Sequence, residues 1–182
     1  ENQELMEWPR DRHERFLPKE LRGSTVGIVG YGSVGRELAR LLRPLEVKTL
    51  AVKRDLMHPE DEGYSATGLG DPNGDLFTRL YPALALASMV KECDYLVVCL
   101  PLTHETRNII NETILKAVKP GAYLVHAGRG GTIDPTALAT ALHEKRLSGA
   151  ALDVFNEEPL PPGNPLWRVP NLLISPHIAG LS

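Results

Sequence analysis

The sequence predicts an α/β protein with a doubly wound parallel sheet and helices on both faces. Three observations lead to this fold class. Short apolar runs bounded by glycine or proline, typical of fully buried strands, alternate with stretches of helical periodicity. The first strand, helix and second strand together occupy about 30 residues, the size of one βαβ unit. With 182 residues, 42% of them hydrophobic and 24% charged, the chain can form one good core and at most a small second lobe.

The expected elements follow one another with few interruptions. Residues 25–29 are an apolar run that directly precedes a glycine-rich turn, and Pro44 ends the helix that begins near Val34. Asp134 followed by Pro135 is a typical helix start. Because strands and helices alternate and such crossovers are right-handed, the strands should be parallel. In full, we expect strands at 25–29, 47–52, 94–100, 121–126, 149–154 and 171–175, and helices at 34–43, 83–91, 111–118 and 134–146.

Residues 55–82 interrupt this alternation. They contain four glycines and three prolines and show little periodicity. We expect a long loop or an insertion there. Loops of this length are unusual in a compact domain and are often functional.

The composition argues against several classes of protein. The net charge is −3, without the basic face that a nucleic-acid partner would require. No apolar stretch approaches the roughly 18 residues that a membrane helix needs. Cys93 and Cys99 lie in or beside an apolar run, which predicts buried thiols in a reducing compartment and hence a cytoplasmic protein. We expect no metal site and no serine nucleophile, because the sequence has neither a Cys/His zinc spacing nor a nucleophile elbow.

The motif Gly30-Tyr-Gly-Ser-Val-Gly35 follows a strand and opens a helix, the context in which G-x-G-x-x-G binds a dinucleotide. Gly30 permits the tight turn, Gly32 lets the backbone approach a pyrophosphate, and Gly35 lets the helix pack against the strand. The helix N-terminus offers N–H groups and a positive dipole end to the phosphates. A ligand-free turn is the weaker alternative, because glycines disfavour a helix start unless they are used. The fold is therefore expected to be of the Rossmann type.

The end of the second strand carries Lys53 and Arg54 where an NAD site would usually have an acid. Two cations suit a ribose 2′-phosphate, so NADP is favoured over NAD. The alternative is that Lys53 and Arg54 are solvated charges and that Asp55 binds the ribose. NAD therefore stays open as the cofactor.

Three further residues follow successive strands and fit one reaction. Reducing a keto acid requires a cation for the carboxylate and carbonyl, a proton donor with a pKa near neutrality, and a carboxylate that orients this donor. Arg129, His177 and Glu158 supply these groups. Since the carboxyl ends of parallel strands meet at one edge, the three should converge there.

These segments resemble the cofactor domain of the D-isomer-specific 2-hydroxyacid dehydrogenases. Five motifs occur in the order typical of that family and span nearly the whole chain. They are residues 21–35, 99–106, 128–131, 151–160 and 175–180. Five ordered motifs are far more specific than any one of them.

The resemblance implies roles for individual residues. Arg129 would bind the carboxylate and keto oxygen of a small 2-keto or 2-hydroxy acid. His177 would be the acid/base catalyst, paired with Glu158 rather than Glu157, because the glutamate of the family directly precedes the proline. Asp153 would hold the nicotinamide carboxamide. The remaining cofactor contacts would be Ser33, Val34, Leu100, Pro101, Thr106, Ala127, Gly128, Ala179 and Gly180.

The sequence also departs from the family pattern. His126 stands where the family usually has Asn, the acid after the second strand is replaced, and the 55–82 stretch is longer than usual. The resemblance covers only the cofactor domain of the family, so we expect an excised cofactor domain or a chain whose substrate domain lies outside this sequence. Residues 1–17 are therefore interpreted as a connector or helix from that domain, and residues 18–182 as the dinucleotide-binding domain with its insertion. A homodimer is implied by the resemblance alone.

The sequence thus predicts an oxidoreductase that transfers a hydride between NAD(P)H and a small 2-keto or 2-hydroxy acid. The domain alone should bind dinucleotide but catalyse poorly, because such substrates react in a closed cleft between two lobes. A dinucleotide-sensing, corepressor-like binding module is the alternative, although a sensor has less use for Arg129, Glu158 and His177 together. A Rossmann-like methyltransferase is disfavoured by the complete pyrophosphate turn.

Overall fold

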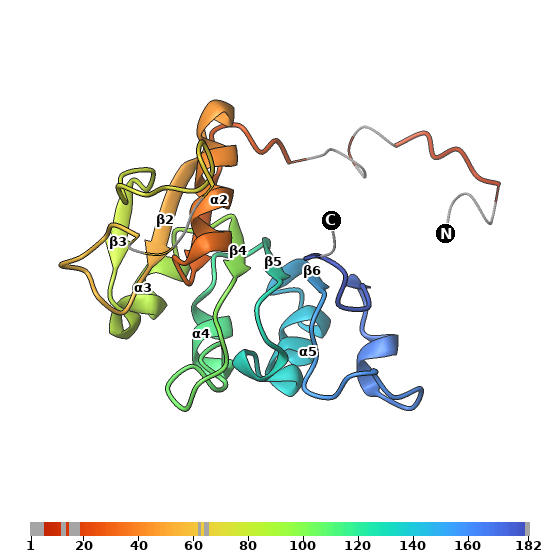
Figure 1. Ribbon diagram of the computed structural model, residues 1–182. Helices are drawn as coiled ribbons and strands as arrows, with labels where there is room; N and C mark the ends of the chain where they lie inside the picture. Colours follow the sequence, from red (N-terminus) through yellow and green to blue (C-terminus); the bar gives the residue numbers. More distant parts are fainter. Residues whose placement is uncertain (1–5, 12–13, 15–18, 62, 64–65, 181–182) are drawn as a thin grey trace.

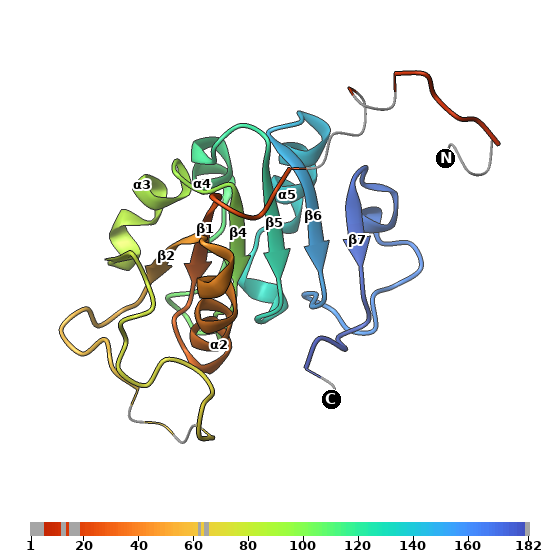
Figure 2. The same ribbon diagram turned by 90° about the horizontal axis from the view of Figure 1, so that it is seen from above.

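The computed structural model describes residues 6–11, 14, 19–61, 63 and 66–180. Its centre is a seven-stranded, fully parallel sheet with the strand order β3-β2-β1-β4-β5-β6-β7 (Figures 1 and 2). The strands are β1 (Thr25–Val29), β2 (Lys48–Val52), β3 (Arg79–Tyr81), β4 (Tyr95–Val98), β5 (Ala122–His126), β6 (Leu147–Leu152) and β7 (Leu172–Ile174). The predicted fold class, a Rossmann-type doubly wound sheet, is confirmed.

Helices cover both faces of the sheet. Helix α2 (Ser33–Leu42) lies on one face, and α3 (Leu86–Val90), α4 (Glu112–Ala117) and α5 (Pro135–His143) lie on the other (Figure 2). The described residues also form four short 3₁₀ turns: η1 (Arg43–Leu45), η2 (Ala83–Ala85), η3 (Gly130–Thr132) and η4 (Pro165–Arg168). Asp134 caps α5 as its sequence predicts, since the carboxylate accepts the N–H groups of Thr136 and Ala137 at 2.9 and 3.1 Å.

The core has two parts because the sheet is buried on both faces. The larger part packs under α3, α4 and α5, and the smaller part lies under α2. Strand residues such as Leu50, Leu96 and Leu124 have at most 1% of their surface exposed, as expected for a parallel sheet covered on both sides. The sheet is therefore a rigid base for the loops at its edges.

From β1 to β3 each new strand is added on one side of β1, and from β4 to β7 each is added on the other side. The strand order therefore reverses between β1 and β4. Ligands of doubly wound proteins bind outside the carboxyl ends of the strands at such a switch point. The loops after β1, β2, β4, β5 and β6 all reach this edge, and they carry most of the residues that the sequence marks as functional.

Several boundaries differ from the sequence expectation. The last residues of the expected 55–82 loop, Arg79–Tyr81, pair with β2 as a three-residue edge strand, which is too short to show a period. Strand β6 begins and ends two residues earlier than the expected 149–154, so Asp153 lies just past its carboxyl end. Much of the expected connector, residues 1–17, lies outside the described residues, and residues 6–11 there contain no helix or strand.

An aspartate holds the amino ends of two strands together. Asp94, directly before β4, accepts the N–H of Thr25 at the start of β1 at 2.9 Å and forms ion pairs at 2.6 Å with Lys19 and Lys119. Its side chain is 8% exposed. Burial alone would raise the pKa of Asp94, but these hydrogen bonds and charges outweigh it and hold the pKa well below its usual range.

Candidate functional site: a dinucleotide turn beside a His–Glu pair

The glycine turn after β1 has the geometry that its spacing predicts. Gly30 has φ +105°, a conformation that favours glycine, and a Cβ there would lie 3.1 Å from the Cys99 backbone. A Cβ at Gly35 would overlap the Gly30 carbonyl and come within 2.9 Å of the Ile28 side chain. Both glycines are thus required by packing inside the domain.

Gly32 differs from its two neighbours in the motif. A Cβ at Gly32 would meet no atom within 4 Å, and its φ of −95° suits any residue. Gly32 is the N-cap of α2, where no side chain caps the helix and the first turn has no acidic residue. The first N–H groups of a helix have no partner within the helix. An anionic group such as a pyrophosphate fits this open, uncapped end.

The end of β2 gives the two predicted cations different surroundings. The Lys53 ammonium donates to the backbone carbonyls of His58 and Glu60. Arg54 is exposed. Asp55, the alternative ribose ligand, accepts the N–H of Met57 at 2.9 Å and faces His58 Nδ1 at 2.8 Å. The structure therefore separates Lys53 and Arg54, which the sequence grouped together.

The loop after β4 closes on itself beside the glycine turn. Thr106 donates its hydroxyl to the Pro101 carbonyl at 2.7 Å and accepts the Thr103 N–H at 2.7 Å. Leu100 is half-buried, and its backbone lies against Gly128, where a Cβ would come within 2.6 Å of the Leu100 oxygen. The β4 and β5 loops are therefore in direct backbone contact.

Arg129 follows β5 on an extended backbone and is exposed. Its Nη1 donates to the Gly128 carbonyl at 2.8 Å. On its other side, a Cβ at Gly130 would overlap the Phe155 carbonyl, so the Arg129 loop also touches the backbone of the loop after β6. Two glycines thus hold Arg129 between the β4 and β6 loops.

A buried network supports the Arg129 loop from beneath. Thr132 Oγ1 donates to the Arg129 carbonyl at 2.8 Å and lies 2.9 Å from His126 Nε2. Since the hydroxyl proton is already used, Nε2 must be the donor to Thr132. Burial lowers the pKa of His126 to about 4, against the opposing effect of a hydrogen bond to the Arg129 backbone, so the imidazole is neutral near pH 7. Sequence reasoning did not single out Thr132, because no motif distinguishes it.

Glu158 and His177 form the predicted pair. His177 Nδ1 lies 2.6 Å from Glu158 Oε2, and Glu158 Oε1 accepts the Phe155 N–H at 2.8 Å. The hydrogen bonds from His177 and from Phe155 lower the pKa of Glu158 below its ordinary value. An ionised carboxylate at Nδ1 keeps a proton on that nitrogen and leaves Nε2 for exchange with another group.

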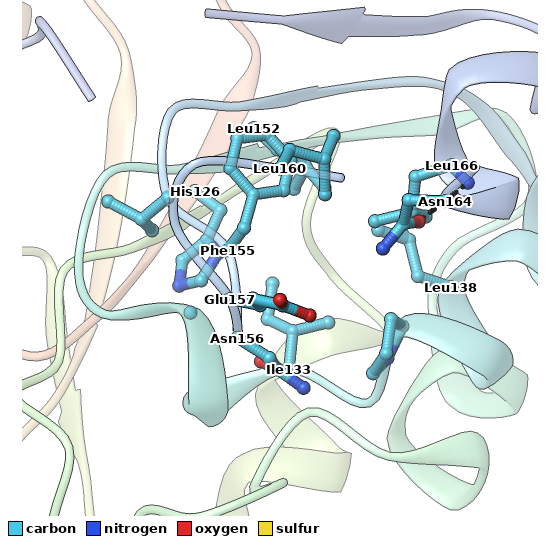
Figure 3. A pocket seen from close by; sticks show the side chains of 13 residues that line it. His126, Ile133, Leu138, Leu152, Phe155, Asn156, Glu157, Leu160, Asn164 and Leu166 are labelled. Atoms are coloured by element: carbon cyan, nitrogen blue, oxygen red, sulfur yellow. Dashed lines mark hydrogen bonds between the residues drawn. The ribbon is translucent and has the colours of Figure 1, made fainter. Parts of the chain in front are cut away.

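The neighbouring glutamate points elsewhere. Glu157 lines a cavity of about 170 Å³ together with Phe155 and Asn156, as Figure 3 shows. His126 and the start of α5 form other parts of its wall. Glu158, in contrast, lines a second cavity of about 390 Å³ that it shares with His177. This arrangement agrees with the expectation that Glu158, not Glu157, is the partner of His177.

Asp153 holds the turn that carries His177. Its Oδ1 accepts the Ser175 hydroxyl at 2.6 Å and the Ile178 N–H at 2.9 Å, and its Oδ2 accepts the Ala179 N–H at 2.9 Å. His177 itself has φ +53°, an uncommon conformation for a non-glycine residue. Such strain persists only where the surroundings enforce it, and Asp153 does so from both sides of His177. Ser175 was not predicted, although its place before Pro-His in the last motif was visible.

The remaining predicted contacts have these positions. Ser33 and Val34 are exposed in the first turn of α2, Ala127 is half-buried directly after β5, and Gly180 is exposed beyond the His177 turn.

Within the described residues, no group of three metal-ligating side chains could hold an ion. None of the described helices has the length and apolar character required to cross a bilayer. Cys93 and Cys99 are free, and burial raises their pKa values to about 12 and 11.

Comparison with known proteins places this geometry in context. The chain is 35% identical over 97% of its length to an (S)-sulfolactate dehydrogenase of Chromohalobacter salexigens, covering 52% of that protein. It is 36% identical over 95% of its length to a glyoxylate reductase of Thermofilum pendens, covering 47% of that protein. The chain therefore spans about half the length of these relatives.

Solved structures of similar proteins also match nearly the whole of this chain over about half of their own length. A phosphoglycerate dehydrogenase from Lactobacillus plantarum superimposes with a TM-score of 0.82 and 31% identity, over 100% of this chain and 53% of that chain. A D-isomer specific 2-hydroxyacid dehydrogenase from Xanthobacter autotrophicus, solved with NADPH and MES, has a TM-score of 0.77 and 29% identity, over 97% of this chain and 50% of that one.

The family profile agrees with both comparisons. The profile described as "D-isomer specific 2-hydroxyacid dehydrogenase, NAD binding domain" matches residues 1–179, nearly the whole chain. The resemblance inferred from five sequence motifs is thereby confirmed, and this chain belongs to the D-isomer specific 2-hydroxyacid dehydrogenase family, NAD binding domain.

Proposed function

We propose that this chain is the cofactor-binding half of an oxidoreductase that moves a hydride between NAD(P)H and a small 2-keto or 2-hydroxy acid. The observation that carries this proposal is the 2.6 Å contact between His177 Nδ1 and Glu158 Oε2 at the sheet edge that also carries the open turn at Gly32. A proton donor with an ionised partner, on the same sheet edge as a dinucleotide turn, is what reduction of a carbonyl by a bound dinucleotide requires.

The proposed roles follow from the positions of the three side chains. A bound dihydronicotinamide would supply the hydride that reaches the carbonyl carbon. Arg129 would bind the substrate carboxylate and stabilise the charge that develops on the carbonyl oxygen. His177 would give that oxygen a proton from Nε2, while Glu158 stabilises the imidazolium before the transfer. In the reverse direction, His177 would accept the hydroxyl proton.

The residues at the glycine turn fit the absent dinucleotide. The open face at Gly32 and the uncapped start of α2 leave room and N–H groups for the pyrophosphate, with Ser33 and Val34 beside it. Leu100, Pro101 and Thr106 would contact the adenosine half. Ala127 and Gly128 would line the nicotinamide, and Asp153, Ala179 and Gly180 would lie near its carboxamide.

We propose that the chain prefers NADP over NAD and that Arg54 is the main residue that binds the 2′-phosphate. Arg54 is exposed at the strand end, whereas Asp55, the acid that could bind a free ribose hydroxyl, already faces His58. Arginine matches phosphate geometry with its planar fork. The Lys53 ammonium, committed to two carbonyls, would add charge nearby but less direct contact.

The similar proteins support the substrate class. The relatives named above are a sulfolactate dehydrogenase and a glyoxylate reductase, both named for small acids. The sensing alternative gains no support from these comparisons. A homodimer and a cytoplasmic location stay predictions, the first from family resemblance and the second from two free thiols. The molar mass of the protein, measured by light scattering during size-exclusion chromatography, would test the dimer.

The cofactor proposal is tested by titrating the chain with NADPH and NADH in parallel by calorimetry. We expect both to bind and NADPH to bind more tightly. Arg54→Ala should weaken NADPH by about tenfold, the scale of a lost charge-assisted hydrogen bond, and should leave NADH nearly unchanged. Arg43→Ala, an exposed arginine at the far end of α2, is the control and should change neither.

Each result bears on a different part of the proposal. Binding of neither nucleotide to the chain would contradict the dinucleotide site. Tighter binding of NADH would contradict the assignment of Arg54 and point to Asp55. Turnover of NADPH with glyoxylate by the complete protein tests the chemistry, and its absence for a panel of small 2-keto acids would overturn the proposed reaction.

A further inference from the structure

Arg36 is a buried cation whose partners are all outside its own helix. It lies in α2 directly after the last glycine of the turn, with 2% of its surface exposed. Nη1 donates to the Asp71 carbonyl at 2.5 Å, and Nη2 donates to the carbonyls of Pro59 and Glu60 at 2.5 and 3.0 Å. All three acceptors belong to the insertion. A buried guanidinium is costly unless it is paired, so this side chain has a specific structural task.

The Arg36 guanidinium also interacts with an aromatic ring and with a carboxylate. Its carbon lies 4.9 Å from the centre of the Tyr31 ring, and Nε lies 3.5 Å from Asp61 Oδ2 without hydrogen-bond geometry. Tyr31 stands between the first two glycines of the turn and donates its hydroxyl to Asp71 Oδ2 at 2.6 Å. The Asp71 carboxylate also accepts the backbone N–H groups of Asp75 and Leu76.

These contacts join two limbs of the insertion, residues 59–61 and 71–74. The Asp61 N–H donates to the Pro72 carbonyl at 3.0 Å. Gly74, with φ +66°, lies so close to Pro59 that a Cβ would overlap the Pro59 carbonyl. Arg36 bonds to both limbs at once. The described part of the insertion is therefore an ordered loop that is hydrogen-bonded to Tyr31 and Arg36 of the phosphate-binding turn and its helix.

The first limb also holds the end of β2. The Glu60 carbonyl accepts from Arg36 Nη2 at 3.0 Å and from Lys53 Nζ at 3.3 Å, so one oxygen joins the two cations. Lys53 also donates to the His58 carbonyl. Residues 53–60 thus form a turn whose shape depends on Arg36 at one end and on Lys53 at the other.

Arg54 follows Lys53 in this turn and is exposed. The hydrogen bond from Thr103 is the main cause of the lowered pKa of Glu105, and the positive charge of Arg54 adds to it. The 53–60 turn follows β2 and the loop that contains Glu105 follows β4, and these two strands flank β1 in the sheet. The adenosine ribose of a dinucleotide would enter between these two loops.

We propose that Arg36 and Lys53 are positioning residues for cofactor choice: together they fix the 53–60 turn so that Arg54 is held at the adenosine ribose. This inference rests on the proposed function, since it assumes a dinucleotide at this edge. In this view the insertion is a specificity element, and neither Arg36 nor Lys53 needs to touch the cofactor. Pre-organising Arg54 spares the cost of ordering a long side chain and its turn on binding.

The test is the ratio of the NADH and NADPH dissociation constants, measured by calorimetry on the whole chain. Arg36→Met and Lys53→Met should each lower the preference for NADPH by about fivefold to tenfold, part of the value of one charged hydrogen bond. Lys48→Met, at the other end of β2 and ion-paired with Glu92, and Arg43→Met are matched controls that should leave the ratio unchanged. If Arg36→Met fails to fold, Tyr31→Phe removes only the hydroxyl that holds Asp71 and should lower the ratio more weakly.

The double variant separates positioning from direct phosphate binding by Lys53. If both residues act through the shared turn, the two effects on the ratio should be clearly less than multiplicative. Multiplicative effects would assign Lys53 to the phosphate itself and overturn the inference. An unchanged ratio with lower thermal stability would also overturn it, because the network would then serve stability alone. Failure of the unmodified chain to bind either nucleotide would instead contradict the proposed function.

Discussion

The Asp153 carboxylate accepts the backbone N–H of Ile178 at 2.9 Å, and so fixes the residue that directly follows His177. The same carboxylate accepts the N–H of Ala179 and the hydroxyl of Ser175. One side chain at the end of β6 thereby holds the turn after β7 in which His177 adopts its left-handed conformation. The orientation of the proposed acid/base residue therefore depends on a neighbouring strand.

Replacing Asp153 by Asn should misplace His177. An amide has one acceptor oxygen, so its NH₂ group would face a backbone N–H that now lacks an acceptor. We expect kcat for a small 2-keto acid to fall about 10- to 100-fold, the usual scale for losing a group that orients a functional residue. Ser175→Ala, which removes one of the three bonds, should have a smaller effect. If Asp153→Asn raised the NADPH dissociation constant and left kcat unchanged, the nicotinamide contact would be its main role.

Removing the imidazole tests the acid/base assignment. His177→Ala in the complete protein should lower turnover by about 10²- to 10⁴-fold, the usual contribution of a general acid. The NADPH affinity of the chain should stay within about twofold, because His177 is not placed on the adenosine or pyrophosphate side. Normal turnover in this variant would refute the role. His143→Ala, an exposed histidine at the end of α5, serves as the control.

Glu158 should give the pair its dependence on pH. Hydrogen bonds from His177 and Phe155 hold the pKa of Glu158 below its ordinary value, so the carboxylate stays ionised throughout the neutral range. Its support of the pair is present above the ordinary glutamate pKa and is lost as pH falls through the lowered value. Glu158→Gln should therefore lower kcat at neutral pH, and the difference from the unmodified protein should shrink in acid. The kcat–pH profiles of both proteins check this, with Glu157→Gln as the control.

Gly32 and Gly35 should separate ligand binding from folding. A Cβ at Gly32 meets nothing, so Gly32→Val should keep the circular dichroism and melting temperature of the chain but abolish NADPH binding. A Cβ at Gly35 meets the Gly30 carbonyl and Ile28, so Gly35→Val should destabilise the domain by about 1–3 kcal/mol or more through overpacking. Retained affinity in Gly32→Val would contradict the phosphate-turn assignment, whatever the outcome for Gly35.

Asp94 should make stability depend on pH in the acid range. Its pKa is held below the ordinary value, so its contribution is complete above about pH 4 and is lost as pH falls through the lowered pKa. Asp94→Asn should cost about 1–3 kcal/mol at pH 7, measured by urea unfolding, because charged hydrogen bonds to a buried group are lost. The difference in stability between the two proteins should shrink steadily as pH falls below about 4. Glu112→Gln, in an exposed pair with Lys116, should change stability by less than about 0.5 kcal/mol.

Local patterns were sufficient for much of the fold. Apolar runs predicted six of the strands, Asp134 predicted the start of α5 and Pro44 predicted the end of α2, because these signals lie within a few neighbouring residues. Strand β3 was missed because a three-residue edge strand has no measurable period and exists only through its pairing with β2. The start of β6 was misplaced by two residues for a similar reason, since its first residue, Leu147, pairs with β5 across a bulge.

The insertion shows the limit of such reasoning most clearly. Its glycines and prolines predicted a loop and nothing more. Its described limbs, residues 59–61 and 71–74, are joined by Arg36, a residue on another element whose sequence position suggests only an exposed helix cation. The contact between Arg36 and the carbonyls of the two limbs joins residues more than 20 positions apart, and no local pattern encodes it.

The sequence by itself determined the fold class, the dinucleotide turn and the order of Arg129, Glu158 and His177, because spacing along the chain expresses how strands, turns and motifs repeat. Only the tertiary structure decided several of the contacts around these residues: Asp153 toward the His177 turn, Thr132 toward the Arg129 carbonyl, and Lys53 toward backbone carbonyls instead of open solvent. These choices depend on which loops meet at the sheet edge, and that is set by packing between segments far apart in the chain.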